Sequence, residues 1–479
     1  MSQLTRRSML LTSSAAALYS ATGPLARLAH ASEMAGRPAT ADRRFSSPAI
    51  ETVIRETSRR IADPHLASMF EQCFPNTLDT TVFFNDQGSS PDTFIITGDI
   101  DAMWLRDSSS QVWPYLRFAR GDSRLQAMLQ GVVRRHVKSI LIDPYANAFM
   151  RSPEDAPLSW ARNDDTTMTP GVAERKWEVD SLCHVVRFAH GYWRNTGDNT
   201  PFDATWKASA WKIVETFREQ QRKDGHGPYR FQRSSRTPTD TLPLGGYGNP
   251  ARANGLIFSM FRPSDDACIY PLFIPANLFA VQALSNLTEL AYKVAQDERL
   301  AKACDDLRRE VQSALTQYGT VQHQTLGTIW AYEVDGYGNT LMMDDAGVPS
   351  LLSLPYLGCC PSNDTLYQRT RHFVLSTDNP YFISGRAAKG VGSPHIGISN
   401  IWPMSIIVQA MTSEEDQEIV QCLRWLRDTT AGTGFIHESF NKDDASHFTR
   451  QWFAWANTLF GELILMLMER KPSLLQVAL

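Results

Sequence analysis

The sequence predicts an all-α protein, and three observations support this prediction. Apolar residues recur at helical spacing in about a dozen segments, whereas strand-like runs are few and short. The long polar connections between these segments lack the repetitive Gly/Ser or Pro composition of an interdomain linker. About a dozen helices permit six hairpins closed into an (α/α)6 toroid, with a few short β-strands in the loops. Periodicity alone does not separate this fold from a solenoid or from two bundles.

Each element follows from its apolar spacing and from the residues that interrupt it. The first helical pattern runs from Ser47 to about Phe74 and breaks at Pro64, because proline cannot continue a helix. Short β-like runs follow at 80–84 and 93–96. Later helices are expected at 109–118, 123–142, 177–195, 205–221, 271–295, 300–318, 365–375, 400–412, 414–429 and 455–470, with a short one near Ser350.

The bulk composition indicates a globular chain. Of its 479 residues, 43% are hydrophobic and 20% charged, which suits one large domain or two to three ordinary ones. Loops longer than about 15 residues inside a compact domain are usually functional. We therefore expect residues 32–479 to form a single domain whose long loops gather at one end.

The N-terminal residues predict a targeting segment. Paired arginines at Arg6 and Arg7 precede a short apolar stretch that reaches Tyr19, and a small-x-small site lies at 29–31. This pattern is typical of a twin-arginine signal peptide over residues 1–31, and it predicts export to the periplasm or beyond the cell. The alternative is an uncleaved anchor. No other stretch is apolar enough to span a bilayer, so we expect no membrane span in the mature chain.

Charge and cysteine usage exclude several classes of partner. The formal net charge is −4, which argues against nucleic acid or an anionic membrane. The 7 cysteines are odd in number and show no CxxC spacing, which fits neither a disulfide framework nor a zinc site. The glycines of 385–392 make no GxGxxG pattern, so a nucleotide site is not expected. We expect neither a metal nor a cofactor.

The stretch 97–111 departs most clearly from ordinary scaffold. Its charged residues and its tryptophan lie within a dozen positions of one another: Asp99, Asp101, Trp104, Arg106 and Asp107. Crowded carboxylates need a cation, a protonated partner or a polyhydroxylated ligand to offset their repulsion. Trp104 offers a flat apolar face that suits a sugar ring. We interpret this stretch as one wall of a sugar-binding pocket; the alternative is a helix N-cap formed by Asp107 and the serines that follow it.

Two adjacent carboxylates, Asp265 and Asp266, stand beside Arg262 before a predicted helix. Two neighbouring acids that are partly buried do not both ionise easily, so one is expected to hold a proton at neutral pH, as a general acid must. The alternative is that Ser264 caps the helix and that the helix dipole favours the two acids. A second charged cluster at 174–181 is consistent with a solvated first helical turn.

Glu438 is the candidate general base. It lies in 434–441 among aromatic residues and a hydroxyl, a setting that suits a carboxylate orienting a water molecule. Position 441 is Asn where a zincin would carry its second histidine, and the chain contains no GxSxG elbow. These absences argue against a metalloprotease and a serine hydrolase; a purely structural Glu438 is the alternative.

Several of these motifs together resemble glycoside hydrolase family 125, the metal-independent exo-α-1,6-mannosidases. They are the stretch 97–111, the run 262–266, the run 437–441 and the run 452–457, and the resemblance covers nearly the whole mature chain. It implies an (α/α)6 barrel that hydrolyses non-reducing terminal α-1,6-linked mannose with inversion. It also implies a Glu base, which carries over onto Glu438, and an Asp acid, which carries over onto the pair Asp265 and Asp266, with Asp266 preferred.

The residue chemistry agrees with this resemblance. An inverting glycosidase needs two carboxyl groups roughly 6.5–9.5 Å apart, one protonated and one ionised. The alternatives are another glycan-active (α/α)6 enzyme such as a polysaccharide lyase, or a mannan-binding protein without activity. The expected partner is a mannose-containing oligosaccharide or glycan. The residues expected to hold the sugar are Asp99, Asp101, Trp104, Arg106, Asp107, Arg262, His395 and Trp402.

Overall fold

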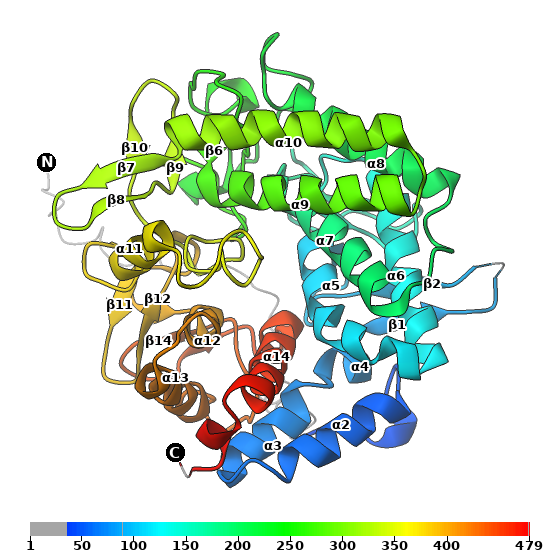
Figure 1. The fold of residues 1–479 in the computed structure, drawn as a ribbon, viewed down its shortest axis with the longest axis vertical. Coiled ribbons are helices and arrows are strands. Elements are labelled where there is room, and N and C mark those ends of the chain that lie inside the picture. The colour runs from blue at the N-terminus through cyan, green and yellow to red at the C-terminus, as the bar shows by residue number, and fades with distance from the viewer. Residues whose placement is uncertain (1–35, 89, 478) are drawn as a thin grey trace, which may run out of the picture. The chain divides into compact units, whose positions relative to one another are not determined.

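The computed structural model describes residues 36–88, 90–477 and 479, and the segment Arg37–Leu479 forms one compact unit. The predicted signal peptide, residues 1–31, lies outside the described residues. Helices dominate the described part of the chain, where thirteen α-helices, α2 to α14, are joined by short strands and long loops (Figure 1).

Burial separates the helices into an inner and an outer set. All nine residues of α12 are buried, whereas α10 buries seven of its 21 residues along one stripe. A helix that is buried all round lies inside a structure, and an amphipathic one covers it. The inner helices are α5 (Leu105–Val112), α7 (Val179–Thr196), α9 (Ile274–Lys293), α12 (Pro403–Met411) and α14 (Ala454–Arg470).

The inner helices pack side by side in a ring. Helix α7 lies between α5 and α9, and α14 lies between α5 and α12 (Figure 1). Turns at 350–358 pack against this ring, where the Tyr356 carbonyl accepts a hydrogen bond from Arg187 of α7 and its hydroxyl donates one to Glu462 of α14. The short helix expected near Ser350 is therefore a run of turns, because Pro349 and Pro355 lack the N–H groups that a helix needs.

An outer layer of helices surrounds this ring. Helix α8 packs between α6 and α10, while α9 pairs with α10 and α12 with α13. The outer helices are α2 (Pro48–Ser58), α3 (Pro64–Cys73), α6 (Ser123–Ile142), α8 (Ala204–Glu219), α10 (Glu298–Tyr318), α11 (Thr365–Val374) and α13 (Asp416–Asp428), with the short α4 (Asn76–Thr80) beside them. The predicted (α/α)6 toroid is confirmed.

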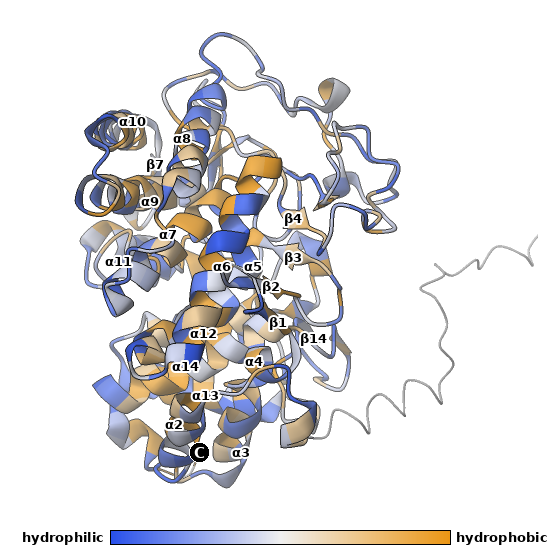
Figure 2. Cartoon of the chain, turned by 90° about the vertical axis from the view of Figure 1, so that its right-hand side faces the viewer, coloured by the Kyte–Doolittle hydropathy of each residue, from blue (hydrophilic) through white to orange (hydrophobic). Residues whose placement is uncertain are grey.

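Short antiparallel strands lie where the inner helices begin. Strands β3 (Met103–Trp104), β6 (Leu272–Phe273) and β13 (Asn400–Ile401) lead into α5, α9 and α12, directly or after one residue. They belong to three sheets with the orders β3-β4-β5, β10-β9-β6 and β13-β14-β15. Because β3, β4 and β14 lie on one side of the molecule in Figure 2, the N-terminal ends of the inner helices share that side.

The remaining strands are distributed along the whole described chain. The three-stranded sheets also contain β4 (Ala148–Phe149), β5 (Val172–Glu174), β9 (Glu333–Val334), β10 (Thr340–Leu341), β14 (Ser439–Asn441) and β15 (Phe448–Thr449). The two-stranded pairs are β1 (Val82–Asn85) with β2 (Asp92–Ile95), β7 (Thr320–His323) with β8 (Gly327–Trp330), and β11 (Phe382–Ser384) with β12 (Lys389–Val391). Both β-like runs expected before position 97 are thus confirmed as β1 and β2.

Helix α5 differs from its prediction in a way that bears on the site. It begins at Leu105 and ends at Val112, after which a 3₁₀ helix runs from Trp113 to Gly121. The serines 108–110 bond to carbonyl oxygens of 104–106 inside the helix, so they do not cap it. The N-cap interpretation of this stretch is therefore wrong. Across the described residues, no helix is both long and apolar enough to cross a membrane.

Candidate active site

The acidic pair occupies a tight turn at the barrel end where the inner helices begin. Arg262 N–H donates to the Asp266 carbonyl at 2.8 Å, and Asp265 N–H donates to the Arg262 carbonyl at 2.9 Å. Asp265 adopts a left-handed backbone with φ of 68°, which is uncommon for a residue other than glycine. The turn therefore presents Asp265, whose side chain is 29% exposed, and leaves that of Asp266 at 3%.

Arg262 and Ser264 hold this turn in place through hydrogen bonds to buried carboxylates. Arg262 Nε donates to Glu333 at 2.6 Å in a fully buried ion pair, and the same carboxylate accepts from Tyr270 N–H at 2.8 Å. Ser264 Oγ donates to Asp345 at 2.7 Å, and helix α9 begins only at Ile274. Arg262 thus has a structural role beside Glu333, while its Nη2 has no hydrogen-bond partner among the described residues and its sugar contact stays a prediction. The alternative of Ser264 as a helix cap is wrong.

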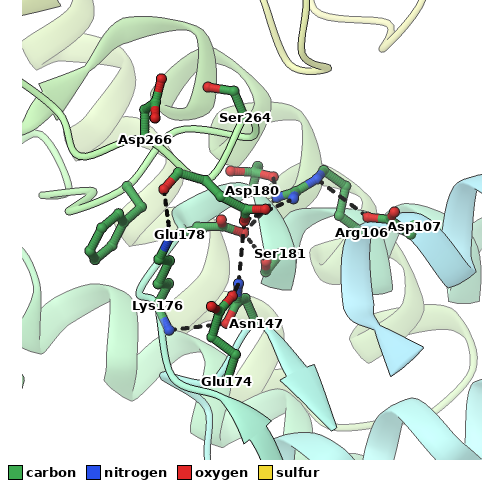
Figure 3. Close-up of polar contacts among 12 residues, drawn as sticks. Arg106, Asp107, Asn147, Glu174, Lys176, Glu178, Asp180, Ser181, Ser264 and Asp266 are labelled. Atoms are coloured by element: carbon green, nitrogen blue, oxygen red, sulfur yellow. Dashed lines mark hydrogen bonds and ion pairs between the residues drawn. The ribbon is translucent and has the colours of Figure 1, made fainter. Parts of the chain in front are cut away.

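Arg106 gathers four carboxylates around one guanidinium, and Figure 3 shows those of Asp107, Glu178 and Asp180 beside it. Its Nη1 donates to Glu178 at 2.5 Å and to Asp180 at 3.1 Å, and further carboxylate oxygens lie 3.7 Å away on Asp107 and Asp265. Glu178 and Asp180 are fully buried, so the interpretation of 174–181 as a solvated turn is wrong for them. Arg106 offsets the repulsion among these four acids, of which only Asp107 belongs to the crowded stretch 97–111.

This crowding decides which carboxyl carries a proton. Burial raises the pKa of Glu178 well above its usual range; Arg106 opposes the shift, and the charges of Asp265 and Asp180 add to it. Burial also disfavours ionised Asp265, but Lys176, Arg106 and a hydrogen bond with Glu178 lower its pKa overall. The two carboxyls therefore titrate as a coupled pair, in which burial favours the neutral form of Glu178 and the nearby cations favour the charged form of Asp265.

Asp107 lies at the edge of the same cluster. Burial raises the pKa of Asp107 to about 6, even though Arg106 and Arg450 attract its charged form. Arg450 belongs to the loop before α14. The Asp107 carboxylate is therefore attracted by two arginines that are far apart in sequence, Arg106 and Arg450. Asp107 therefore links the acidic cluster around Arg106 to the loop that carries Glu438.

His395 is the point where the loops converge. Its Nδ1 lies 3.3 Å from Asp266 Oδ1. Burial alone would lower the pKa of the imidazole, but the bond to Asp266 and the charges of Asp266, Asp265 and Glu438 raise it to about 9. His395 is thus an imidazolium at neutral pH. The residues that follow His395 form β13, which pairs with β14 directly after Glu438, so this loop brings the acidic pair and Glu438 to one end of the barrel.

The loop before α14 supplies Glu438 with partners of its own. Thr449 Oγ1 donates to Glu438 Oε2 at 2.9 Å, and Arg450 Nη1 lies 3.4 Å from Oε1. Arg450 also donates to Asp99 at 2.5 Å and stacks over Phe453 at 4.6 Å. Sequence reasoning did not assign a role to Arg450 or Thr449. The proximity of Arg450 to Glu438 along the chain was the available signal.

Gly98 lets the stretch 97–111 approach this loop. Its φ of 128° and a bridge to Phe453 bring the two backbones together, and a Cβ at position 98 would lie 2.5 Å from the Trp452 carbonyl oxygen. Thr97 then accepts a hydrogen bond from Ala454 N–H at 3.0 Å. Asp99 is thereby placed next to Arg450, although 351 residues separate them in sequence.

Asp101 and Trp104, which are predicted to contact the sugar, differ in their surroundings from the other candidate residues. The side chain of Asp101 is 73% exposed and pairs with Arg151 at 2.9 Å on the surface. Trp104 is 5% exposed because its ring packs in a small apolar cluster with Ala102, Ala148 and Ala173. The Asp101 carboxylate thus lies at the surface and the Trp104 ring is enclosed, and the sugar contacts of both residues stay predictions.

Buried polar atoms without a hydrogen-bond partner among the described residues recur at this end of the barrel. They are Arg106 Nε, Glu178 Oε1, Asp180 Oδ1, Asp266 Oδ2, Trp402 Nε1 and Trp455 Nε1. Buried polar groups in proteins are normally paired, so each of these atoms calls for an explanation. A polyhydroxylated ligand could satisfy donors and acceptors alike. In the same described residues, no three His, Cys, Asp or Glu side chains are grouped to hold a metal ion.

Comparison with known proteins decides the family. The profile of the family described as metal-independent alpha-mannosidase (GH125) matches residues 63–465. The chain belongs to glycoside hydrolase family 125. It is a glycosidase, an α-mannosidase of the metal-independent family, as the resemblance of its motifs predicted.

Two relatives cover most of this family 125 chain. The Meiotically up-regulated gene 157 protein of Schizosaccharomyces pombe is 43% identical over 475 residues, covering 96% of this chain and 92% of its own. A Streptococcus pneumoniae metal-independent α-mannosidase, solved as a non-productive complex with α-1,6-mannobiose, is 38% identical with a TM-score of 0.84. That match covers 89% of this chain and 100% of the other.

Proposed function

We propose that this α-mannosidase removes non-reducing terminal mannose from α-1,6-linked mannosides with inversion at the anomeric carbon. The observation that carries the proposal is that the loop of His395 joins two parts of the chain that are far apart in sequence. The His395 ring lies 3.3 Å from Asp266, next to Asp265, and the same loop continues into β13, which pairs with β14 directly after Glu438. An inverting glycosidase needs two carboxyl groups on opposite sides of the scissile bond. The α-1,6-mannobiose bound by the Streptococcus pneumoniae relative supports the choice of linkage.

Asp265 is the proposed general acid. Its carboxyl is the more exposed of the pair, whereas that of Asp266 is enclosed and paired with His395. A sugar that covers Asp265 removes water from it and favours its neutral form, and the proton held by the pair with Glu178 is available to it. Asp265 then donates this proton to the glycosidic oxygen as the bond to C1 breaks, so the leaving sugar departs as an alcohol.

Glu438 is the proposed general base. Thr449 and Arg450 hold both of its oxygens, which fixes the direction of the carboxylate. Glu438 takes a proton from a water molecule as that water bonds to C1 on the face opposite the departing oxygen. The product is β-mannose, and the two carboxyls return to their starting protonation by exchange with solvent.

The remaining predicted residues near these groups are proposed to hold the terminal mannose. Trp402 Nε1 and Asp266 Oδ2 are buried polar atoms without a partner in the described residues, so sugar hydroxyls can complete their hydrogen bonds. The imidazolium of His395 adds a donor, and Asp99 and Asp107 offer acceptors beside Arg450 and Arg106. Each of these contacts is a proposal about the bound state.

The test is to follow the hydrolysis of α-1,6-mannobiose by proton NMR. We expect the anomeric signal of β-mannose to appear first and that of α-mannose to grow later by mutarotation. Release of α-mannose first would contradict inversion. Absence of mannose, together with turnover of α-1,2- or α-1,3-mannobiose, would contradict the proposed linkage.

We also propose that the protein is exported through a twin-arginine signal peptide, on the evidence of Arg6, Arg7 and the site at 29–31. In a bacterial host with this pathway, the processed enzyme should be found outside the cytoplasm. Replacing both arginines with lysine should leave it unprocessed in the cytoplasm. Unchanged export of that variant would contradict the proposal.

A further inference from the structure

Trp160 differs from the other tryptophans in its exposure to solvent. The chain has 12 tryptophans, all within the described residues, and Trp160 alone is exposed, with 46% of its surface accessible. It lies on the long loop between β4 and β5. An exposed tryptophan loses apolar burial unless something covers it, so its location relative to the active site is informative.

The loop holds Trp160 in a fixed orientation. Its Nε1 donates to Glu174 Oε1 at 3.1 Å, and Glu174 is itself buried on β5. Next to it, Leu158 N–H donates to the Ala173 carbonyl at 3.3 Å, and Asp164 is held by Arg233 at 2.7 Å. A ring fixed in this way loses little freedom when a ligand covers it, which favours binding.

The contacts of Trp160 lead to the proposed acid. Glu174 Oε2 accepts a hydrogen bond from Asn147 Nδ2 at 3.0 Å, and the same amide lies 3.5 Å from Asp265 Oδ1 (Figure 3 shows Glu174 and Asn147). Only two side chains therefore separate the indole from Asp265. Glu438 is held by different residues, Thr449 and Arg450. The indole thus belongs to the hydrogen-bonded surroundings of Asp265, whereas Thr449 and Arg450 surround Glu438.

We propose that Trp160 is a stacking platform for the mannose residues on the leaving-group side of the scissile bond. The inference rests on the proposed function, because an acid at Asp265 protonates the oxygen that links the terminal mannose to the rest of the glycan. The exposed face of the indole covers the apolar C–H face of a sugar ring, while its N–H stays bonded to Glu174. The ligand class is an α-mannooligosaccharide longer than one residue.

The test compares two substrates that differ on the leaving-group side. α-Mannosyl fluoride carries no sugar there, whereas α-1,6-mannotriose carries two. For Trp160→Ala we expect the ratio of kcat/KM for mannotriose to that for the fluoride to fall about tenfold, the order of one lost aromatic contact. Trp160→Phe should restore most of the ratio. Tyr292→Ala, which removes an exposed aromatic at the far end of α9, is the matched control and should leave the ratio unchanged.

Binding provides a readout that does not depend on turnover. In a Glu438→Gln background, calorimetry should show Trp160→Ala weakening mannotriose about tenfold more than it weakens mannose. An equal effect on both ligands, or no effect, would overturn the platform while leaving the proposed function intact. Failure of the wild-type enzyme to cleave mannotriose while it hydrolyses the fluoride would instead contradict the proposed linkage. Circular dichroism and thermal melts of each variant show whether it is folded.

Discussion

Asp265 lies on the loop before α9, and Glu438 lies on the loop before α14. Each loop is held by an asparagine of the helix that follows it, with the same pattern of hydrogen bonds. The Asn277 amide accepts from Ile257 N–H at 2.8 Å and donates to the carbonyls of Ile257 and Phe273 at 2.9 Å. Each of the two loops is therefore closed by one asparagine that holds its entry and its exit together.

The second loop repeats this arrangement. The Asn457 amide accepts from Ile436 N–H at 2.9 Å and donates to the carbonyls of Ile436 and Phe453 at 3.0 and 2.8 Å. The two carboxyl groups therefore sit on matched supports. Any difference in their chemical role has to come from their neighbours.

Those neighbours differ in the balance of charge. Around Asp265, the acids Glu178, Asp180 and Asp107 crowd one arginine, and burial raises the pKa of Glu178, which favours its neutral form. Glu438 instead has Arg450 and the Thr449 hydroxyl directed at its oxygens. The comparison teaches that a shared backbone arrangement can serve an acid or a base, and that the surrounding charges select which.

Removing the base should have the largest effect. Glu438→Gln keeps the shape and the contact with Thr449 but cannot take a proton from water, so kcat for α-1,6-mannobiose should fall by roughly 10³-fold or more. Binding of the disaccharide should persist by calorimetry. Glu469→Gln, an exposed residue near the end of α14, is the matched control. Residual activity within tenfold of the wild type would remove Glu438 from the base role.

Removing the acid should have an effect that depends on the leaving group. For Asp265→Asn we expect kcat for α-1,6-mannobiose to fall by roughly 10²–10⁴-fold, and much less for α-mannosyl fluoride, whose departure needs less help from a proton. Asp266→Asn should lower kcat for both substrates by similar and smaller factors, because it removes the partner of His395. The reverse pattern would assign the acid to Asp266.

A substitution that loosens the turn of Asp265 but leaves the Asp265 carboxyl in place should have an intermediate effect on kcat. Asp345 Oδ2 accepts from Ser264 at 2.7 Å and from Ser393 at 3.1 Å, so it ties the turn of Asp265 to the loop of His395. Asp345→Asn should lower kcat about tenfold, since small misplacements of reacting groups are costly.

The adjacent Asp344 provides the control for this prediction. It is equally buried but accepts from Leu351 and Leu352 N–H, away from the acid turn. Asp344→Asn removes one of these two acceptors, so we expect it to lower the melting temperature while changing kcat little, because neither hydrogen bond involves the acid turn. Equal losses of kcat in the two variants, with equal melting temperatures, would contradict a positioning role for Asp345.

The smallest effect is expected in the pH dependence of stability. His395 has a pKa raised to about 9 in the folded protein, above its ordinary value of 6.5, so its charged form stabilises the fold. This contribution is complete below about pH 6.5 and is lost as the pH rises through about 9. Between those limits the melting temperature of the wild type should fall a few degrees more than that of His395→Gln. His447→Gln, an exposed histidine, should behave as the wild type. Parallel curves for the wild type and His395→Gln would contradict this assignment.

The sequence determined the helical repeat, the family motifs and the two short segments that hold the proposed acid and base. These features are local: apolar spacing reports one face of a helix, and a motif is read from consecutive residues. The first helix with its break at Pro64 and the strands before position 97 follow from such signals.

Only the tertiary structure decided which charged groups meet. It paired Asp99 with Arg450 across 351 residues, enclosed Glu178 and Asp180 around Arg106, and left Asp101 on the surface. The protonation of a carboxyl depends on its burial and on charges a few ångströms away, and the neighbours responsible come from distant parts of the chain. Residue types in one stretch therefore indicated an acidic site, but the roles within it required the fold.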